Sequence, residues 1–244
     1  MGATEFEVPK LYPVIHNEGV SRTLSAVESV LEAGADGVFL INHANNAASL
    51  INRYEAVLRR FPDAFVGLNF LSMRDPLDVY FYLNTSGTVP DAVWTDRFSL
   101  EPAYMDQMKA LTPQADARRA LLFAGVSHKG TTTYTSDPIQ SELMTRIADP
   151  YIDFVTTTGP RTGEAAPLDK VVAMRGALNH AKLAIASGVT PQNIGDYVPY
   201  TDAILVASSI EATFGEIDPE RLSCLMAAFR VSIEVDRETR QPTS

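Results

Sequence analysis

Short apolar runs alternate with amphipathic helical patterns along nearly the whole chain. In the helical stretches apolar residues recur at spacings of three and four, as at Leu24, Val27 and Leu31. Such alternation is typical of βαβ units and of a parallel sheet. The pattern predicts strands at residues 11–16, 37–41, 65–70, 92–95, 120–124 and 152–156, a seventh run that ends at Ser187, and an eighth strand at 203–206.

A helical pattern follows each predicted strand. The helices are expected to end at Gly34, to cover residues 46–60, 75–83, 101–111, 138–148 and 167–178, and to start after Thr190 and at Asp218-Pro219. Eight strands and eight helices in strict alternation predict an α/β protein of the (β/α)8 TIM-barrel class, formed as a single domain over residues 1–244. A doubly wound open sheet is the alternative, but it needs fewer units, and no Gly-x-Gly-x-x-Gly turn follows the first strand.

The segment from Ile185 to Ser209 carries the most specific chemical pattern. It reads as a strand, a glycine turn at Gly188, a short helix after Thr190-Pro191, and a strand that ends in Ser208-Ser209. In barrels of this class the loops after the last two strands commonly bind phosphate. Glycine lets the main chain approach an anion, and free N–H groups at a helix start attract it. The alternative is an ordinary βα turn capped by Thr190.

Composition and charge narrow the class of protein. Hydrophobic residues make up 45% of the 244 residues, which suffices for a sizeable core. The net charge of −10 disfavours nonspecific binding to nucleic acid or to an anionic membrane surface. We expect a cytoplasmic protein, because the first residues lack a signal-peptide pattern and no apolar run is long enough for a membrane span. The single cysteine, Cys224, is expected to be a buried structural thiol.

Polar side chains collect where the predicted strands end, which is the face that carries barrel active sites. Three of the four histidines lie there, and the fourth, His180, precedes the seventh strand on the opposite face. Histidine and aspartate can transfer protons, and a lysine can neutralise an anion. The candidate catalytic residues are His16, Asn42, His43, Asn69, Asp96, His128 and Lys129. For each one alone, a loop hydrogen bond is the plainer interpretation; their convergence on one face favours a functional site.

The loop from Gly130 to Asp137 is long and rich in hydroxyl groups. We expect it to close over the site when substrate binds, with Tyr134 as the apolar contact. No cofactor is expected. Two histidines one residue apart and the helical His-Glu-x-x-His are both absent, so a metal is weakly supported, although histidines on separate strands can converge on one.

Several segments together resemble the BtpA family of phosphate-binding-type barrels. They are GLNFLSMRDP, the Ser127-His128-Lys129 element, VTTTGPRTGEAAPLDKV and IASGVTPQNIGDYVPYTDAILVASSIE, of which the last two are the most specific. The N-terminal third reads HNEGVS and INHANN where family members typically carry a Gly/Pro-rich segment and an acidic residue. More distantly, the chain is similar to ribulose-phosphate-binding barrels, which bind a sugar or alkyl phosphate at the same two loops.

The leading hypothesis is an enzyme that acts on a phosphorylated small molecule of pentose-phosphate or phosphoribosyl type. The reaction would be acid/base chemistry, either isomerisation or cleavage or transfer at a glycosidic bond. The candidate phosphate-binding residues are Gly159, Thr162, Gly163, Ser187, Gly188, Ser208 and Ser209. A non-catalytic assembly or regulatory barrel of the BtpA type and a metal-dependent hydrolase are the alternatives. The partner is then a phosphorylated substrate, with no nucleic acid and no membrane, and a homo-oligomer is left open.

Overall fold

Eight parallel strands close into a barrel in chain order in the computed structural model, which describes residues 8–16, 19–44, 46–73, 75–111 and 120–240. Each strand pairs with the next, and β1 pairs with β8 to complete the ring. The strands are β1 (Lys10–Ile15), β2 (Val38–Ile41), β3 (Val66–Asn69), β4 (Ala92–Thr95), β5 (Leu121–Gly125), β6 (Phe154–Thr157), β7 (Lys182–Ile185) and β8 (Ala203–Val206). The predicted (β/α)8 barrel is confirmed.

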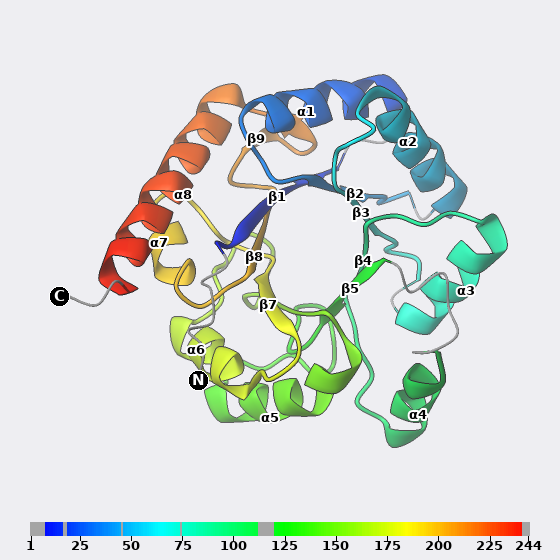
Figure 1. Ribbon diagram of the computed structural model, residues 1–244, viewed down its shortest axis with the longest axis vertical. Coiled ribbons are helices and arrows are strands. Elements are labelled where there is room, and N and C mark those ends of the chain that lie inside the picture. The colour runs from blue at the N-terminus through cyan, green and yellow to red at the C-terminus, as the bar shows by residue number, and fades with distance from the viewer. Residues whose placement is uncertain (1–7, 17–18, 45, 74, 112–119, 241–244) are drawn as a thin grey trace.

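The helices form a ring around the strands (Figure 1). They are α1 (Val20–Glu32), α2 (Ala47–Arg60), α3 (Pro76–Ser86), α4 (Pro102–Leu111), α5 (Pro138–Ala148), α6 (Leu168–Ala177), α7 (Ile194–Tyr197) and α8 (Pro219–Arg240), with a short 3-10 turn at Asp149–Tyr151. Among the described residues, no helix combines the length and the apolar character that crossing a bilayer requires.

An aspartate followed by a proline starts three of these helices. The side chains of Asp75, Asp137 and Asp218 each accept hydrogen bonds from main-chain N–H groups of the first turn. Proline suits the next position, because the first N–H groups of a helix have no partner within it. The local sequence therefore fixes where α3, α5 and α8 begin.

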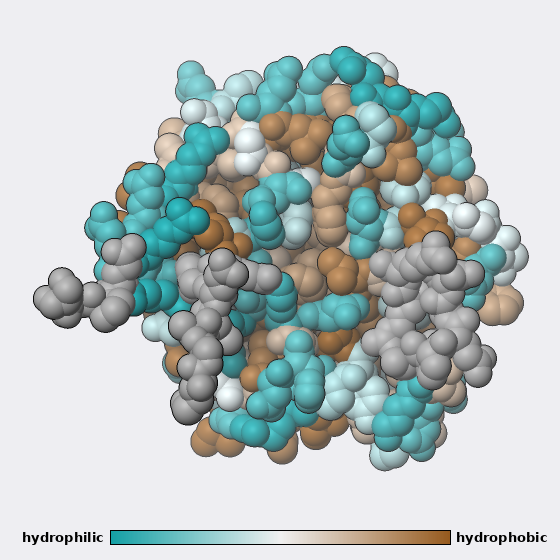
Figure 2. All heavy atoms as spheres, viewed as in Figure 1, coloured by the Kyte–Doolittle hydropathy of each residue, from teal (hydrophilic) through white to brown (hydrophobic). Residues whose placement is uncertain are grey.

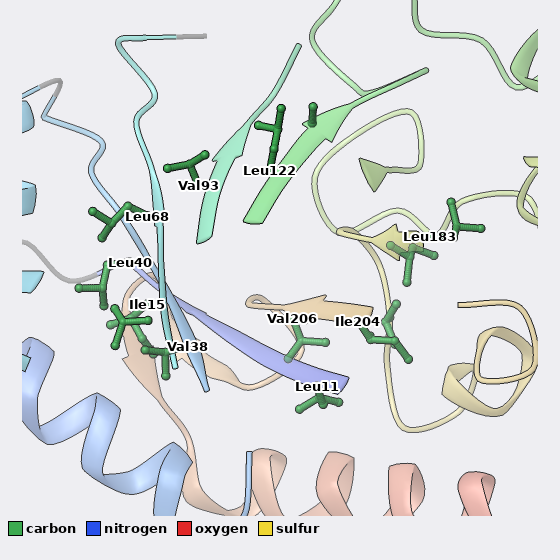
Figure 3. Close-up of a cluster of buried hydrophobic side chains, with 14 of the residues drawn as sticks. Leu11, Ile15, Val38, Leu40, Leu68, Val93, Leu122, Leu183, Ile204 and Val206 are labelled. Carbon is green, nitrogen blue, oxygen red and sulfur yellow. The ribbon is translucent and has the colours of Figure 1, made fainter. Parts of the chain in front are cut away.

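Two apolar clusters hold the fold together, one between the barrel and the helices and one inside the barrel. The outer cluster takes one side chain in two from successive strands, including Leu11, Val38 and Leu40 (Figure 3). Hydrophilic residues cover much of the edge of the face seen along the barrel, and both hydrophilic and apolar residues lie toward its middle (Figure 2). The inner cluster consists of Tyr12, Val14, Phe39, Ile41, Ala92, Trp94, Phe123, Phe154, Ala184, Ala186, Ala203 and Leu205.

Large and small residues are matched inside the barrel. A Cβ atom at Gly67 would lie 2.3 Å from the Phe39 ring, so the ring fills space that a side chain on β3 would otherwise take. Phe123 and Phe154 stack with their centroids 4.1 Å apart. These aromatic rings fill the barrel interior, and a cavity lined by side chains of the strands opens toward their carboxyl ends.

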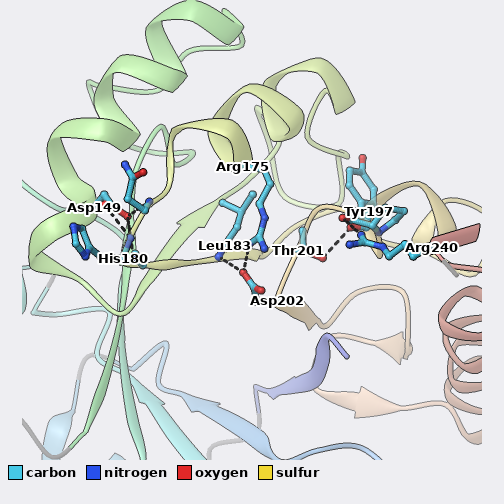
Figure 4. Close-up of polar contacts among 11 residues, drawn as sticks. Asp149, Arg175, His180, Leu183, Tyr197, Thr201, Asp202 and Arg240 are labelled. Carbon is cyan, nitrogen blue, oxygen red and sulfur yellow. Dashed lines mark hydrogen bonds and ion pairs between the residues drawn. The ribbon is translucent and has the colours of Figure 1, made fainter. Parts of the chain in front are cut away.

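Four carboxylates fasten the amino ends of the strands. Asp202, just before β8, accepts a hydrogen bond from the N–H of Leu183 on β7. It also forms an ion pair with Arg175 (Figure 4). Asp36, Asp91 and Asp153 hold β1, β3 and β5 in the same way from the positions before β2, β4 and β6. At this end Asp149 also binds the N–H of His180, which lies opposite the site as predicted (Figure 4).

Two local predictions are wrong. Cys224 is exposed, because the buried face of α8 is formed by Leu222, Leu225, Met226 and Phe229 and residue 224 points away from it. The helix expected after Thr190 begins only at Ile194 and spans four residues. The Asn193 side chain accepts a hydrogen bond from the Thr190 N–H, so Thr190 does not cap this helix.

After β8 the chain forms a small hairpin that the sequence pattern did not predict. Its strands are β9 (Glu211–Thr213) and β10 (Glu216–Ile217), which pair in antiparallel fashion. Gly215 takes a left-handed conformation in the turn, and its N–H donates to the Glu211 side chain. The hairpin places Phe214 at the mouth of the barrel.

Candidate functional site

A cavity of about 350 Å³ opens at the carboxyl ends of the strands. Its residues follow from the two-residue period of the strands, because every second side chain points into the barrel. Val14, Ile41, Asn69, Trp94, Ala186 and Leu205 form one inward layer, and His16, His43, Leu71, Asp96, Gly188 and Ala207 come two residues later. The cavity is thus the open continuation of the packed barrel interior.

All but two of the predicted site residues line this cavity. They are His16, His43, Asn69, Asp96, His128, Lys129, Thr162, Gly163, Ser187, Gly188, Ser208 and Ser209. Asn42 does not belong to the lining, because it falls between the inward positions 41 and 43. Its side chain instead binds the main chain of Ala44 and Asn46 and shapes the turn before α2.

Gly159 also lies outside the lining, and the structure gives it a packing role. A Cβ atom there would lie 2.1 Å from the carbonyl oxygen of Glu164. Gly188 meets the same segment from the next loop, since its Cβ would lie 2.2 Å from the Ala165 nitrogen. The two glycines therefore let the chain at 164–165 pass between the loops after β6 and β7.

Asp96 and His128 lie on neighbouring strand ends, and Asn69 supports the carboxylate. Asn69 Nδ2 donates to Asp96 Oδ1 at 3.3 Å. His128 is buried, and its Nδ1 lies 3.0 Å from the carbonyl oxygen of Lys129. Only a protonated Nδ1 can bond to that oxygen, so Nε2 carries the lone pair in the neutral ring. His128 Nε2 is buried and has no hydrogen-bond partner among the residues that the structure describes.

Burial dominates the electrostatics of His128. It lowers the pKa of the imidazole to about 4, while the Asp96 carboxylate opposes the shift and the charges of Lys129 and Lys170 add to it. Burial also lowers the pKa of Lys129, against the opposing effect of Asp96. His128 lines the cavity, and its neutral imidazole keeps the lone pair on Nε2, which is the form that a general base requires.

Lys129 connects the residues that can transfer protons with the loops that can bind an anion. Its Nζ donates to Ser187 Oγ at 3.4 Å, and Ser187 Oγ in turn donates to the carbonyl oxygen of Arg161. Ser187 ends the β7 segment, whereas Lys129 follows β5. The ammonium group therefore stands at the border between the two parts of the cavity.

Glycines and serines from three loops form the other wall. Gly163, Ser187, Gly188 and Ser208 all line the cavity, and Gly163 and Gly188 have left-handed conformations. Ser209 Oγ is buried without a hydrogen-bond partner. The helix start expected to supply free N–H groups after Thr190 lies at Ile194, and the Thr190 N–H is occupied by the Asn193 side chain. Any anion on this wall would therefore meet the glycine main chain and the serine hydroxyl groups.

An aromatic cluster covers the rim beside β1 and β2. Phe214 stacks on His16 with centroids 4.8 Å apart and meets His43 edge-on at 5.0 Å. The buried carboxylate of Glu211 lies 3.3 Å from His16 Nδ1. Neither Glu211 nor Phe214 was predicted, because both depend on the hairpin after β8.

Unpaired buried polar atoms gather on this cavity. Asn69 Oδ1, Trp94 Nε1, His128 Nε2 and Ser209 Oγ lack hydrogen-bond partners among the described residues. Buried polar groups without partners cost free energy, so such a group at a cavity favours a ligand that satisfies them. Trp94 was not predicted, although its position two residues before Asp96 on β4 would have placed it in the barrel interior.

The loop at 130–137 does not touch the cavity. Ser127 Oγ donates to the carbonyl oxygen of Thr135, and the Tyr134 ring lies over Lys170 Nζ at 4.6 Å. The expected contact of Tyr134 with ligand is therefore absent in this conformation, and closure on substrate stays a prediction. Within the described part of the chain, no group of three His, Cys, Asp or Glu side chains is arranged to hold a metal ion.

Solved structures of similar fold cover nearly the whole chain. A structure described as native KDPGal has a TM-score of 0.62 at 15% identity and covers 96% of this chain and 98% of its own. Phosphoribosyl anthranilate isomerase from Thermotoga maritima has a TM-score of 0.63 at 16% identity, with 92% and 99% covered. At these identities the similarity establishes the barrel fold.

A third similar structure holds a phosphorylated molecule. It is (S)-3-O-geranylgeranylglyceryl phosphate synthase from Thermoplasma acidophilum in complex with its substrate sn-glycerol-1-phosphate. It has a TM-score of 0.63 at 13% identity and covers 92% of this chain and 94% of its own. No curated protein matches the chain at a significant level.

Family membership follows from the sequence of β4 to α8. The model of the BtpA family matches residues 91–230, which is more than half of the chain. The matched region contains Asp96, His128, Lys129 and all the glycine and serine loops, whereas His16, His43 and Asn69 precede it. On this match, the protein belongs to the BtpA family.

Proposed function

We propose that this protein is an enzyme that acts on a phosphorylated small molecule of pentose-phosphate or phosphoribosyl type. One observation carries the proposal: a single cavity has Asp96 and His128 on one side and glycine and serine loops on the other, with Lys129 Nζ bound to Ser187 Oγ between them. The reaction class is acid/base chemistry, as isomerisation or as cleavage or transfer at a glycosidic bond.

The phosphate group would bind the glycine and serine wall. Main-chain N–H groups can approach an anion closely at Gly163 and Gly188, since neither carries a side chain. Ser187, Ser208 and Ser209 supply hydroxyl donors, and within the described part of the chain Ser209 Oγ has no hydrogen-bond partner. Lys129 provides a positive charge at the edge of this wall. Thr162 completes the lining on the β6 side.

The reacting carbon atoms would then lie over Asn69, Trp94, Asp96 and His128. His128 acts as the base, because its neutral ring keeps the Nε2 lone pair. Asp96, whose carboxylate accepts a hydrogen bond from Asn69, transfers a second proton to or from the substrate or orients one of its hydroxyl groups. Asn69 Oδ1 and Trp94 Nε1 are an unpaired acceptor and an unpaired donor, which suits a substrate with several hydroxyl groups.

Two of the structurally similar proteins are named for phosphorylated compounds, a phosphoribosyl anthranilate isomerase and a synthase with bound sn-glycerol-1-phosphate. The similarity supports a phosphorylated substrate without choosing the reaction.

The assembly-protein alternative would rest on a different surface. Large apolar side chains are exposed along α5 and α6, at Ile139, Leu143, Ile147, Leu168 and Val172. In the described part of the chain, α5 and α6 contain no buried polar side-chain atom without a hydrogen-bond partner, whereas several cavity-lining residues do. The enzyme is therefore the better supported function, and metal analysis of the purified protein tests the remaining alternative, a metal-dependent hydrolase.

The phosphate site can be tested with a matched pair of substitutions at Gly163. A Cβ atom there would meet only Ser208 Oγ, at 3.9 Å, so a side chain fits and would point into the anion wall. Asn and Asp tolerate the left-handed conformation of this residue better than other side chains do. Gly163→Asp adds a negative charge, and Gly163→Asn has almost the same shape without it.

Titration calorimetry with ribose 5-phosphate and with inorganic phosphate measures the result. We expect the wild-type protein and Gly163→Asn to bind ribose 5-phosphate and Gly163→Asp to bind it at least about tenfold more weakly, a difference of about 1.4 kcal/mol. Equal affinities for the two variants, or no binding of either probe by the wild type, would contradict the proposed site. Gly188→Asp is a poor probe, because its Cβ would collide with the main chain at 164–165.

A further inference from the structure

A lysine is fully buried beneath the loop that carries His128. Lys170 lies in the first turn of α6, and its side chain is inaccessible to solvent. Among the described residues no carboxylate lies within ion-pair distance of its Nζ. Burial lowers the pKa of this ammonium group to about 7. Buried lysines without an acidic partner are costly, so the position calls for a specific reason.

The Lys170 ammonium group contacts the loops after β5 and β6. Its Nζ donates to the carbonyl oxygen of Ser127 at 2.8 Å and to that of Thr158 at 3.1 Å. The Tyr134 ring covers it at 4.6 Å. The same two loops are also joined by the Lys129 N–H, which donates to Thr158 Oγ1 at 2.7 Å. Lys170 therefore fixes the main chain on either side of the residues that reach the cavity.

Ser127 shows that this part of the main chain is held under strain. It is the one described residue other than glycine with a left-handed conformation, at φ 49°. Such a conformation costs about 1–3 kcal/mol and persists only where surrounding contacts enforce it. Ser127 Oγ is bound to both the N–H and the carbonyl oxygen of Thr135, and its own carbonyl oxygen accepts from Lys170. His128 is the next residue.

We propose that Lys170 is a positioning residue for His128: it holds the carbonyl groups of Ser127 and Thr158 so that the imidazole keeps its proton on Nδ1 and its lone pair on Nε2. The inference rests on the proposed function only for the catalytic use of His128. A neutral amine still has two N–H donors for the two carbonyl oxygens, so the positioning persists above pH 7, where Lys170 loses its proton.

The charge of Lys170 has a second effect on His128. The charged groups that act on the imidazole are Asp96 from the end of β4, Lys129 from its own loop and Lys170 from α6. In the range where His128 titrates, Lys170 is protonated and opposes a further positive charge. Removal of Lys170 should therefore raise the pKa of His128, while desolvation continues to lower it.

Nitrogen-detected NMR of the imidazole rings tests both effects without a substrate. The His128 signal is identified by its absence in His128→Ala. In the wild-type protein we expect the proton on Nδ1, an unprotonated Nε2 and a pKa well below 6.5. In Lys170→Met we expect the titration midpoint to rise and the Nε2–H tautomer to appear. Lys170→Gln removes the charge but keeps N–H donors, so the midpoint should rise and the tautomer should stay.

Lys109→Met is the matched control. Lys109 also lies over a tyrosine ring, that of Tyr151, but on the exposed surface of α4. Its removal should leave the titration of His128 unchanged. Unchanged midpoint and tautomer in a folded Lys170→Met would overturn the proposal. If neither Lys170 variant folds, the wild-type spectrum decides, since a proton on Nε2 or a midpoint near 6.5 contradicts the proposal by itself. If the wild-type protein binds neither ribose 5-phosphate nor inorganic phosphate, the proposed function is refuted. The NMR result on Lys170 and His128 is unaffected by that outcome.

Discussion

At the scale of single residues, a glycine brings the two proposed proton-transfer groups together. A Cβ atom at Gly125 would lie 2.0 Å from the carbonyl oxygen of Asp96 and 3.0 Å from His128 Cβ. The absence of that atom lets the end of β4 approach the end of β5, and the Phe98 N–H donates to the Gly125 carbonyl oxygen across this contact. The approach of Asp96 to His128 therefore depends on a residue that has no side chain.

The proposed base role of His128 gives a pH dependence with a definite sign. If the neutral ring is the active form, kcat/KM should be flat near neutrality and fall as the pH decreases through the pKa of about 4. His128→Ala should lower turnover by about 10²–10⁴. Asp96→Asn removes a charge that raises the His128 pKa, so the residual acid limb should move to lower pH.

The measurement is a pH–rate profile on the phosphorylated compound that the wild-type enzyme converts. His180→Ala is the control, because His180 lies at the opposite end of the barrel. Full turnover in both His128→Ala and Asp96→Asn would place the chemistry elsewhere.

At the scale of elements, the hairpin β9–β10 closes one side of the cavity. The Arg221 guanidinium, near the start of α8, donates to the carbonyl oxygen of Glu211 in the hairpin. The Glu211 carboxylate accepts the Gly215 N–H in the hairpin turn. Phe214 is 69% exposed even though it stacks on His16. The ring contacts two imidazole rings at the cavity mouth but stays largely exposed, so it stabilises the free protein little. Such a ring is well placed to contact a ligand.

Phe214→Ala should therefore separate stability from binding. We expect a change of less than about 1 kcal/mol in the free energy of unfolding, since surface substitutions have small effects. Loss of an aromatic contact of about 0.5–1.5 kcal/mol should weaken ribose 5-phosphate binding by roughly two- to tenfold. Urea unfolding and calorimetry provide the two numbers, and Phe81→Ala, on the exposed face of α3, is the control. An unchanged affinity would remove Phe214 from the binding site.

The strands were predictable from the sequence because they are short, apolar and bounded by polar turns. Ala92–Thr95 and Ala203–Val206 match the prediction at both ends. The two-residue alternation of side chains along a strand would also have excluded Asn42 from the cavity lining and included Trp94 in it. The loops were less predictable: the Asn193 side chain binds the N–H of Thr190, and Gly159 and Gly188 both adjoin residues 164–165. These contacts join residues whose proximity exists only in the folded barrel.

At the scale of the whole molecule, the barrel has a fourfold repeat at its amino end. Asp36, Asp91, Asp153 and Asp202 each precede an even-numbered strand and accept the N–H of the preceding odd-numbered strand. Each aspartate also donates its own N–H to the carbonyl oxygen of the residue it holds, at Leu11, Val66, Leu122 and Leu183. The site at the carboxyl end has no such repeat. Stability and function therefore occupy opposite ends of the barrel, as is usual for this fold.

This separation predicts that amino-end substitutions lower stability and leave binding intact. Asp91 and Asp153 are the clearest positions, because Asp36 and Asp202 also form ion pairs with Lys10 and Arg175. Asp91→Ala and Asp153→Ala each leave a strand N–H without its acceptor, which should reduce the free energy of unfolding by about 1–3 kcal/mol. Their effects should add in the double variant, since the two carboxylates hold different strand pairs. Asp78→Ala, in the first turn of α3, is the control. Urea unfolding measures the loss, and ribose 5-phosphate affinity should stay at the wild-type value in every folded variant. A parallel fall in affinity would show that the amino-end carboxylates also shape the cavity, and the division of the barrel into a stabilising end and a functional end would fail.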